Sequence, residues 1–365
     1  MRGLVMPEIK AIALIVALTI GAFLLPTVNA HAETVSPALD NQTVTGKMYK
    51  FEKISDGVYF VTAAGNAITG GNHQIFVNDN DVVLVDSGAT PSAMRALLED
   101  MTLITNKPVR VVINTHWHYD HINGNSVFGP DVEIIGQDYV RYSLQNLDLY
   151  AKEVNWKLGD WREQVESLRK RVEKENDPAQ RKLLQDQIAA IESAMSEVKE
   201  IKPVPPATTF TSKMTLFRGQ REIQLLFLGR GHTGGDTVVY LPKERILCTG
   251  DLMESKTSSL SSGFFDEWIT TLTALKKLDF DTVLPGHGTP FRGTALITGF
   301  QDYLTDVIAQ VKKFREQGLS PEETAKKVDM TAHSKDFPQI QGPGIDVIGV
   351  RRIYDWMDSR NKSGQ

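Results

Sequence analysis

Cysteine is almost absent from this chain. Cys248 is the only one among 365 residues, so no intrachain disulfide can form and the fold must be held by a packed core. Cys248 lies within a strand-like stretch at residues 245–249. We therefore expect it to be a small buried core residue rather than a nucleophile.

A surplus of charge of either sign is also lacking. The formal net charge is −5, and no run of basic residues is present. The balance of 40 basic and 45 acidic residues gives no electrostatic reason to expect a nucleic-acid partner. With 41% hydrophobic residues, the chain can fill the core of one large domain.

Long apolar runs are missing except near the N-terminus, at residues 11–25. This run is short for a membrane span, which needs about 20 residues. Basic residues precede it, and small residues suitable for signal cleavage lie at Ala30 and Ala32. We therefore expect residues 1–32 to be a secretory signal peptide, with an uncleaved membrane anchor as the alternative. The mature protein would then be exported, either to the periplasm or as a secreted protein.

Histidine is scarce but clustered. The chain has 8 histidines. Five of them lie in short segments rich in glycine and aspartate: His116, His118, His121, His232 and His287. Imidazole nitrogen and carboxylate oxygen are both good ligands for Zn²⁺ and related divalent metals. These segments therefore predict a metal site.

Three histidines and Asp120 lie within six consecutive positions, directly after a run at residues 109–114 that is typical of a buried strand. His116 and His118, two residues apart, can project the same way from the strand end. Asp120 and His121 are neighbours and face differently. This arrangement favours a second metal beside the first. The alternative is a chance cluster on a solvated loop, and the later histidine and aspartate segments argue against it.

The order of four short motifs resembles that of the metallo-β-lactamase superfamily, in its branch of dinuclear metal hydrolases. The motifs are His116-x-His118-x-Asp120-His121, Gly231-His232-Thr233, Thr249-Gly250-Asp251 and Pro285-Gly286-His287-Gly288. The matching region runs from about residue 51 to residue 291 and is interrupted by one insertion. The resemblance implies a four-layered αββα sandwich with the metals at one edge, between two sheets.

The resemblance also implies roles for individual residues. His116, His118 and His232 would hold one Zn²⁺ ion, Asp120, His121 and His287 would hold a second, and Asp251 would bridge the two. Iron or manganese are the alternatives to zinc. A water activated by both ions would attack the substrate, and Asp120 would orient it or return a proton to the leaving group. Asp86, in a Val-Asp-x-Gly turn, would accept a hydrogen bond from a ligating imidazole, with helix capping as its alternative role.

The residue at position 251 separates branches of the superfamily. The zinc β-lactamases carry Cys or Ser at the position of Asp251, and one major subclass has a lysine three residues later, where this chain has Glu254 with Lys256 nearby. The Gly250-Asp251 pattern instead resembles glyoxalase-II-like thioesterases, lactonases and related esterases. We therefore expect a hydrolase that acts on a small-molecule ester, lactone, thioester or amide. The alternatives are a β-lactamase with a bridging Asp, an iron-dependent persulfide dioxygenase, and a metal-binding accessory protein with little turnover.

Local patterns divide the rest of the chain. Residues 33–46 are polar and aperiodic and predict a mobile leader, whereas residues 47–365 predict one domain. Within this domain, short alternating runs give way to amphipathic helices twice over. Two such half-units predict an α/β (α+β) fold with two sheets packed face to face and helices outside. We expect Ser92 to cap the first helix, and Ser320 to cap another that has Pro321 in its first turn.

Residues 137–202 interrupt this pattern and predict an inserted helical hairpin. Apolar residues recur every three or four positions in two stretches, which Asn176-Asp177-Pro178 separates. We interpret the hairpin as a spacer that packs on itself. A lid near the site and an arm that forms a homo-oligomer are the alternatives.

One further stretch and three single residues are interpreted from their place in the sequence. Residues 258–265, with Trp268, follow Asp251 and are expected to line the substrate groove. His73 and His333 match no motif and are expected to be ordinary polar positions.

Overall fold

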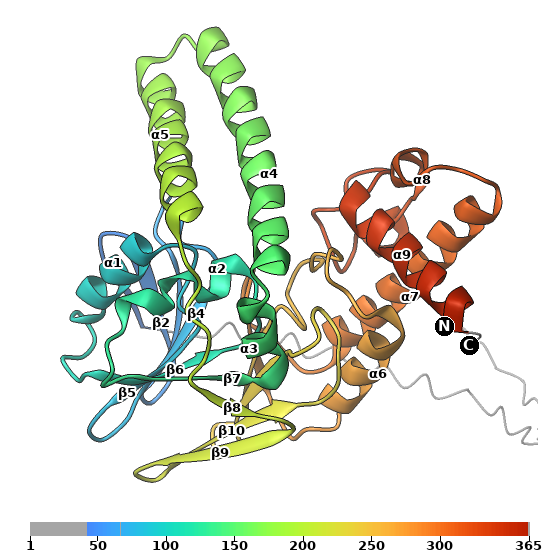
Figure 1. The fold of residues 1–365 in the computed structure, drawn as a ribbon. Coiled ribbons are helices and arrows are strands. Elements are labelled where there is room, and N and C mark those ends of the chain that lie inside the picture. The colour runs from blue at the N-terminus through green and yellow to red at the C-terminus, as the bar shows by residue number, and fades with distance from the viewer. Residues whose placement is uncertain (1–41, 66, 364–365) are drawn as a thin grey trace, which may run out of the picture. The chain divides into compact units, whose positions relative to one another are not determined.

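The computed structural model describes residues 42–65 and 67–363 (Figure 1). The expected signal peptide at residues 1–32 lies outside the described residues, as does most of the expected leader. The leader's end is different: Thr43–Thr45 form strand β1, which pairs antiparallel with β2 (Tyr49–Ser55). Alternating Thr and Val suit such an edge strand. Among the described residues, no helix combines the length and the apolar character that a membrane span requires.

Within the described part of the chain, the strands form two sheets. The first has eight strands in sequence order, in which β1 and β2 are followed by β3 (Val58–Ala63), β4 (His73–Val77), β5 (Val82–Val85), β6 (Val109–Asn114), β7 (Glu133–Gln137) and β8 (Thr208–Phe210). The second has six strands in the order β14-β13-β12-β11-β10-β9, with bounds β9 (Lys213–Arg218), β10 (Arg221–Phe227), β11 (Thr237–Leu241), β12 (Ile246–Gly250), β13 (Thr282–Pro285) and β14 (Phe291–Arg292). The strands pair in parallel from β5 to β8 and between β12 and β13. The loops that follow parallel neighbours therefore leave from the same sheet edge.

Helices cover the outer face of each sheet. The first sheet packs its outer face against α1 (Pro91–Met101), which contributes Met94 and Leu97. The second packs against a cluster that includes residues of α6 (Phe265–Leu275), α7 (Ala295–Glu316), α8 (Pro321–Lys327) and α9 (Val347–Ser363). Short 3₁₀ helices occur at η1 (Asn123–Val127) and η2 (Thr331–His333). These layers confirm the αββα sandwich.

The space between the two sheets is filled by aliphatic and aromatic side chains, among them Phe60, Phe76, Val111, Ile113, Leu225 and Cys248. Cys248 is fully buried, and burial raises the pKa of its thiol. The position confirms that Cys248 is a core residue.

The two expected helix caps have different outcomes. In α8, Ser320 and Glu323 form a reciprocal capping box with Pro321 in the first turn, which confirms the prediction. In α1 the prediction for Ser92 is wrong, because Pro91 takes the first helical position and Thr90 becomes the cap. The Ser92 backbone N–H instead donates to the Glu197 carboxylate at 2.8 Å.

The predicted hairpin contains three helices rather than two. Helix α3 (Asp138–Gln145) packs against β7 and β8 and belongs to the domain. Helices α4 (Leu147–Lys174) and α5 (Pro178–Glu200) then run side by side (Figure 1), with Asp177 capping α5. The base of this pair shares an apolar cluster with Trp117 and Tyr119 in the histidine segment. The interpretation as a spacer that packs only on itself is therefore wrong for its base.

Candidate metal centre

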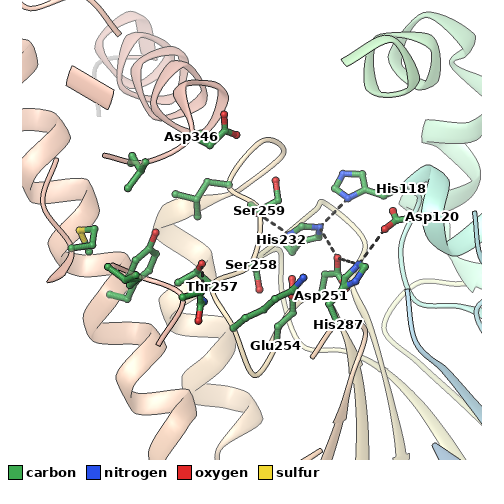
Figure 2. Close-up of a pocket in the computed structure, with 18 of the residues that line it drawn as sticks. His118, Asp120, His232, Asp251, Glu254, Thr257, Ser258, Ser259, His287 and Asp346 are labelled. Atoms are coloured by element: carbon green, nitrogen blue, oxygen red, sulfur yellow. Dashed lines mark hydrogen bonds and ion pairs between the residues drawn. The ribbon is translucent and has the colours of Figure 1, made fainter. Parts of the chain in front are cut away.

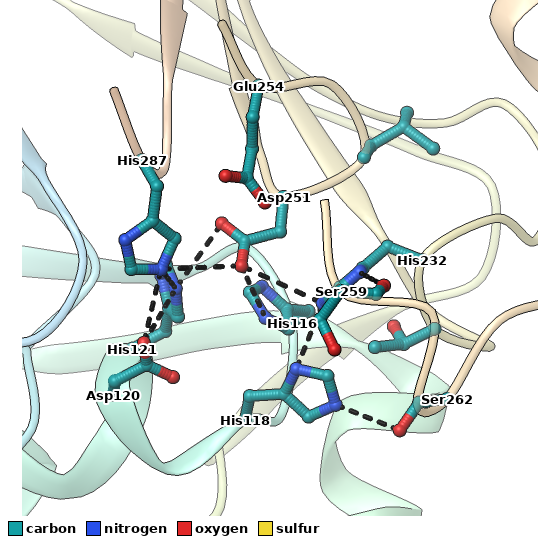
Figure 3. A network of polar contacts seen from close by, with 12 residues as sticks. His116, His118, Asp120, His121, His232, Asp251, Glu254, Ser259, Ser262 and His287 are labelled. Atoms are coloured by element: carbon teal, nitrogen blue, oxygen red, sulfur yellow. Dashed lines mark hydrogen bonds and ion pairs between the residues drawn. The ribbon is translucent and has the colours of Figure 1, made fainter. Parts of the chain in front are cut away.

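The seven residues expected to bind metal meet where strands of both sheets end. The histidine segment follows β6 and runs into the short helix α2 (Tyr119–Ile122). His232 lies between β10 and β11, Asp251 directly follows β12, and His287 follows β13. Figure 3 shows their side chains converging on a common space. Three groups have ligand atoms within 4.8 Å of one another: His116, His118 and His232; His116, His121 and Asp251; and Asp120, His121 and His287.

The first ligand group consists of His116, His118 and His232. Nε2 of His232 lies 2.9 Å from Nδ1 of His118. Nε2 of His116 is buried, and the described residues offer it no hydrogen-bond partner. An unsatisfied buried polar atom costs about 1–3 kcal/mol. The donor set therefore fits a cation held by three imidazole nitrogens.

The opposite nitrogen of each ring in this group contacts a protein oxygen. The contacts join His116 Nδ1 to Thr115 Oγ1 (3.0 Å), His118 Nε2 to Ser262 Oγ (3.0 Å) and His232 Nδ1 to the Ser259 carbonyl (3.1 Å). A carbonyl only accepts, so Nδ1 of His232 carries the proton and its Nε2 keeps a free lone pair. Contacts of this kind fix the orientation of ligating rings.

The second ligand group consists of Asp120, His121 and His287. Nε2 of His287 lies 3.1 Å from the Asp120 carboxylate and 3.3 Å from Nε2 of His121. The group is more open than the first, since the His287 side chain is 22% exposed and that of Asp120 is 16% exposed. Its carboxylate adds a negative charge that the first group lacks.

Asp251 lies between the two groups. Its Oδ2 is 3.7 Å from His232 Nε2 and 3.5 Å from His287 Nε2, and its Oδ1 is 3.4 Å from His121 Nε2. The same Oδ1 is buried without a hydrogen-bond partner among the described residues. One carboxylate within reach of both groups is the arrangement that a bridging ligand requires.

The two groups differ in protonation. Burial lowers the pKa of His116 and His118 well below the usual range and that of His232 to about 4, so these rings are neutral, as ligands must be. Burial also acts to lower the pKa of His121 and His287, but carboxylates, Asp251 first among them, outweigh it and raise both values. The carboxylates around the second group therefore create a negative potential, which favours binding of a cation there.

Asp86 follows β5 and lies behind both groups. Its carboxylate accepts hydrogen bonds from the Thr115 backbone N–H (2.7 Å) and hydroxyl (2.8 Å), and it lies 2.7 Å from Nδ1 of His121. The backbone of Asp86 has φ 60, a left-handed conformation that is costly for a residue other than glycine. The structure thus places the Asp86 carboxylate against the His121 imidazole, and Thr90 rather than Asp86 caps α1.

A cavity of about 500 Å³ opens beside the two ligand groups (Figure 2). Of the groove residues expected from the sequence, Ser258, Ser259 and Leu260 line it. The prediction for Trp268 is wrong, because this side chain is fully buried and donates its N–H to the Leu252 carbonyl at 2.9 Å. The Trp268 indole instead packs edge-on against the His232 ring, with the ring centroids 5.6 Å apart.

Other cavity residues were not predicted as site residues. Helix α4 contributes Glu153, Trp156 and Lys157, and the segment before α9 contributes Gln339, Ile340, Gln341, Ile345 and Asp346. They carry no local motif, because each is a single position in a helix or loop that only the fold brings to the centre. Glu254 is 2% exposed, and burial with the nearby charge of Asp251 raises its pKa to about 8. Lys256 lies 3.8 Å from it and also lines the cavity.

The family model described as the metallo-beta-lactamase superfamily matches residues 69–130 and 149–287, more than half of the chain. The chain belongs to this superfamily. The match covers every position of the seven-residue centre, which agrees with the resemblance carried by the four motifs.

Two kinds of superfamily relative are similar to the chain. A linear primary-alkylsulfatase from a Pseudomonas species is 22% identical over 286 residues, which cover 75% of this chain and 53% of that protein. A metallo-beta-lactamase type 2 from Bacillus cereus is 32% identical over 89 residues, 23% of this chain and 35% of that protein. The chain thus spans about half the length of the first relative.

One solved structure confirms the fold. The sec-alkylsulfatase Pisa1 from Pseudomonas sp. superposes with a TM-score of 0.62 at 16% sequence identity, covering 84% of this chain and 49% of that one. At this level of identity the likeness concerns the fold alone.

Proposed function

We propose that this protein is a metal-dependent hydrolase that holds two divalent ions, zinc as the first expectation, and cleaves an ester-type bond in a small molecule. The position of Asp251 carries the proposal. Its carboxylate lies within 3.4–3.7 Å of ring nitrogens from both ligand groups, so it can serve two ions at once. Iron and manganese are the alternatives to zinc.

The side chains of the two ligand groups would hold the ions, and Asp251 would bridge them. When bound, two such ions would lower the pKa of a shared water and polarise the substrate oxygen. Asp120 lines the cavity and can hold a proton and return it to a leaving group there. The hydrogen bonds to Thr115, Ser259 and Ser262 keep the rings oriented during turnover.

The similarity to alkylsulfatases adds sulfate esters to the candidate substrates, beside carboxylic esters, lactones, thioesters and amides. Two features of the cavity suit an ester with an apolar part: the apolar side chains of Leu260, Ile340 and Ile345 form one part of its lining, and hydroxyls of Thr257 and Ser259 another. These groups can bind a substrate tail and an acidic head respectively.

A second candidate is β-lactam hydrolysis, which the local similarity to the Bacillus cereus metallo-beta-lactamase supports. Asp251 argues for the ester class, since the residue at this position is an aspartate rather than a cysteine or serine. We rank β-lactam hydrolysis below ester hydrolysis for that reason.

The test is a substrate panel with zinc-loaded protein: p-nitrophenyl acetate, p-nitrophenyl sulfate, a primary alkyl sulfate, a lactone, a thioester and a chromogenic cephalosporin. We expect turnover on at least one ester that disappears on chelation and returns with metal. Turnover of the cephalosporin alone would replace the ester proposal by the β-lactamase. Oxygen uptake with a persulfide and iron, or tight metal binding without turnover, would overturn the hydrolase in favour of a dioxygenase or an accessory protein.

We also propose that residues 1–32 direct export. The support is the apolar run at residues 11–25, followed by small residues at Ala30 and Ala32. The intact mass of protein recovered from the periplasm or medium should correspond to a start at His31 or Glu33. A full-length mass in the membrane fraction would show the anchor instead.

A further inference from the structure

We propose that the tripeptide Gly71-Asn72-His73, at the start of β4, is a positioning element that holds all three members of the second ligand group. The inference rests on the proposed two-metal function. Gly71 contacts the segment that carries Asp120 and His121, and Asn72 contacts the loop of His287. His73 reaches His121 indirectly, through Asp86. Nothing in the sequence singles out this tripeptide, since glycine and asparagine are ordinary turn residues and His73 matches no motif.

Gly71 contacts the first two members directly. Its backbone N–H donates to the Asp120 carbonyl at 3.0 Å. A Cβ at Gly71 would lie 2.3 Å from Cε1 of His121, and the shortest distance that real Cβ atoms tolerate is about 3.0 Å. Only glycine therefore lets the backbone lie against this ring.

Asn72 holds the loop of His287. Its backbone N–H donates to the Gly286 carbonyl at 2.6 Å, and its side-chain Nδ2 donates to the carbonyls of Pro285 and Gly288, both at 3.1 Å. These three carbonyls flank His287 on both sides along the chain. Asn72 thus ties a loop of the second sheet to a strand of the first, and sets where the His287 ring enters the centre.

His73 acts on His121 through Asp86. Its Nδ1 lies 3.0 Å from the Asp86 carbonyl, which can only accept, so Nδ1 carries the proton. This bond holds the carbonyl of Asp86, whose backbone has φ 60, and the carboxylate of the same residue lies 2.7 Å from Nδ1 of His121. His73 is fully buried, and burial lowers its pKa to about 4, which keeps the ring neutral with a single N–H.

The first ligand group is oriented by other residues. The outer nitrogens of His116, His118 and His232 contact Thr115, Ser262 and Ser259, none of which belongs to the tripeptide. A change at Asn72 should therefore weaken the second metal position and spare the first, whereas a change at His73 also reaches His116, through Asp86 and Thr115. This selectivity separates a positioning role from a general contribution to folding.

The test compares stepwise zinc affinity in full-length protein carrying Asn72→Ala, His73→Leu or His73→Asn, using competition with a chromophoric chelator. Loss of a hydrogen-bond partner behind a metal ligand typically costs 10- to 100-fold in affinity. We expect that loss in one of the two binding steps for Asn72→Ala, and in at least the same step for His73→Leu. His73→Asn keeps an N–H near the original Nδ1 and should restore most of the affinity.

Two controls assign the lost step. Ser262→Ala removes the partner of His118 and should weaken the other step. In a His287→Ala background, Asn72→Ala should have little further effect, because both changes act on the same ligand.

The outcomes are distinguishable. If wild-type protein binds two ions and turns over substrate while Asn72→Ala and His73→Leu leave both steps unchanged, the tripeptide inference fails and the proposed function stands. If both steps weaken equally in Asn72→Ala, the positioning role is also overturned. If wild-type protein binds no second ion, the proposed function itself fails. Should His73→Leu not fold, Asn72→Ala, whose side chain is only partly buried, still decides.

Discussion

The first and second ligand groups lie side by side yet differ in nearly every physical respect. The first is built from three imidazoles that are at most 4% exposed and that burial keeps neutral. The second combines a carboxylate with two imidazoles of raised pKa, and its His287 and Asp120 side chains are 22% and 16% exposed. The comparison indicates that an ion in the second group would be more exposed to solvent, and therefore easier to exchange, than one in the first.

The largest effect should come from the residue that joins the two groups. Asp251→Asn keeps the size but removes the charge that both ions would share. We expect turnover to fall by more than the roughly 10- to 100-fold that loss of an outer partner costs, with less than two equivalents of metal retained. Elemental analysis and kcat/KM measure this, and Asp346→Asn, elsewhere on the cavity wall, is the control for metal content.

Asp251→Cys sharpens the same test, because a thiolate is a soft ligand suited to zinc. We expect it to retain zinc and to gain β-lactam turnover slightly at most. Wild-type turnover of a β-lactam as efficient as that of an ester would contradict the preferred substrate class.

Thr115→Val should act mainly on the first group. The Thr115 hydroxyl links His116 Nδ1 to Asp86, and valine keeps the shape without that link. We expect about 10- to 100-fold weaker binding of the first-group ion, measured in the same two-step zinc titration. Thr115→Ser retains the hydroxyl and should behave like wild type. Equal weakening of both steps would show that the groups are not independent.

Falling pH should empty the second group first. Its imidazoles have pKa values above their ordinary range, whereas those of the first group lie below it, so protons compete for His121 and His287 at higher pH. Dialysis against buffers from roughly pH 8 to pH 5, followed by metal analysis, should show one equivalent lost before the other. Simultaneous loss of both would remove the distinction.

Glu153 lies on α4, lines the cavity and is close enough to the second group for the charge of Asp120 to act on it. Burial, with the charge of Asp120, raises its pKa from 4.5 to about 8. The folded state therefore binds the Glu153 proton more tightly than the unfolded state does. The resulting contribution to the free energy of unfolding is fully present below about pH 4.5 and is lost as the pH rises towards about 8. In metal-free protein, Glu153→Gln should be more stable than wild type above pH 8 by roughly 2–4 kcal/mol.

Denaturant unfolding across this pH range measures the difference. An ion beside Asp120 would offset the negative charge that Glu153 faces, so the difference should shrink in zinc-loaded protein. A pH-independent difference between the two proteins would contradict the assignment to Glu153.

The smallest effect should come from the far part of the hairpin. The contacts with Trp117 and Tyr119 involve its base, including Val154, Leu158 and Trp161. Replacing residues 168–186 with a short Gly/Ser turn should leave turnover within about twofold, because no residue of this stretch lines the cavity. Light scattering decides whether the far part also serves as an arm between copies, since a change in mass would show that role.

How much the sequence could predict follows from how local each signal is. The histidine segment lies within six consecutive residues after a strand, so its spacing by itself indicates a metal site, and alternating and helical periodicities by themselves indicate the layers. Ser320 and Pro321 specify a helix start through contacts four residues apart at most. The error at the start of α1 is equally local: the cap is Thr90, only two positions before the expected Ser92, because Pro91 occupies the first helical position.

The rest was decided by tertiary structure, because it depends on pairs of residues far apart in the chain. Asn72 meets Gly288 across 216 positions, and Glu153 reaches the cavity only because the hairpin base packs on the histidine segment. His73 has the sequence context of an ordinary strand residue, and its link to His121 exists only through the left-handed backbone of Asp86. No periodicity or motif encodes such contacts, since burial and hydrogen bonding between distant segments arise only when the two sheets have packed.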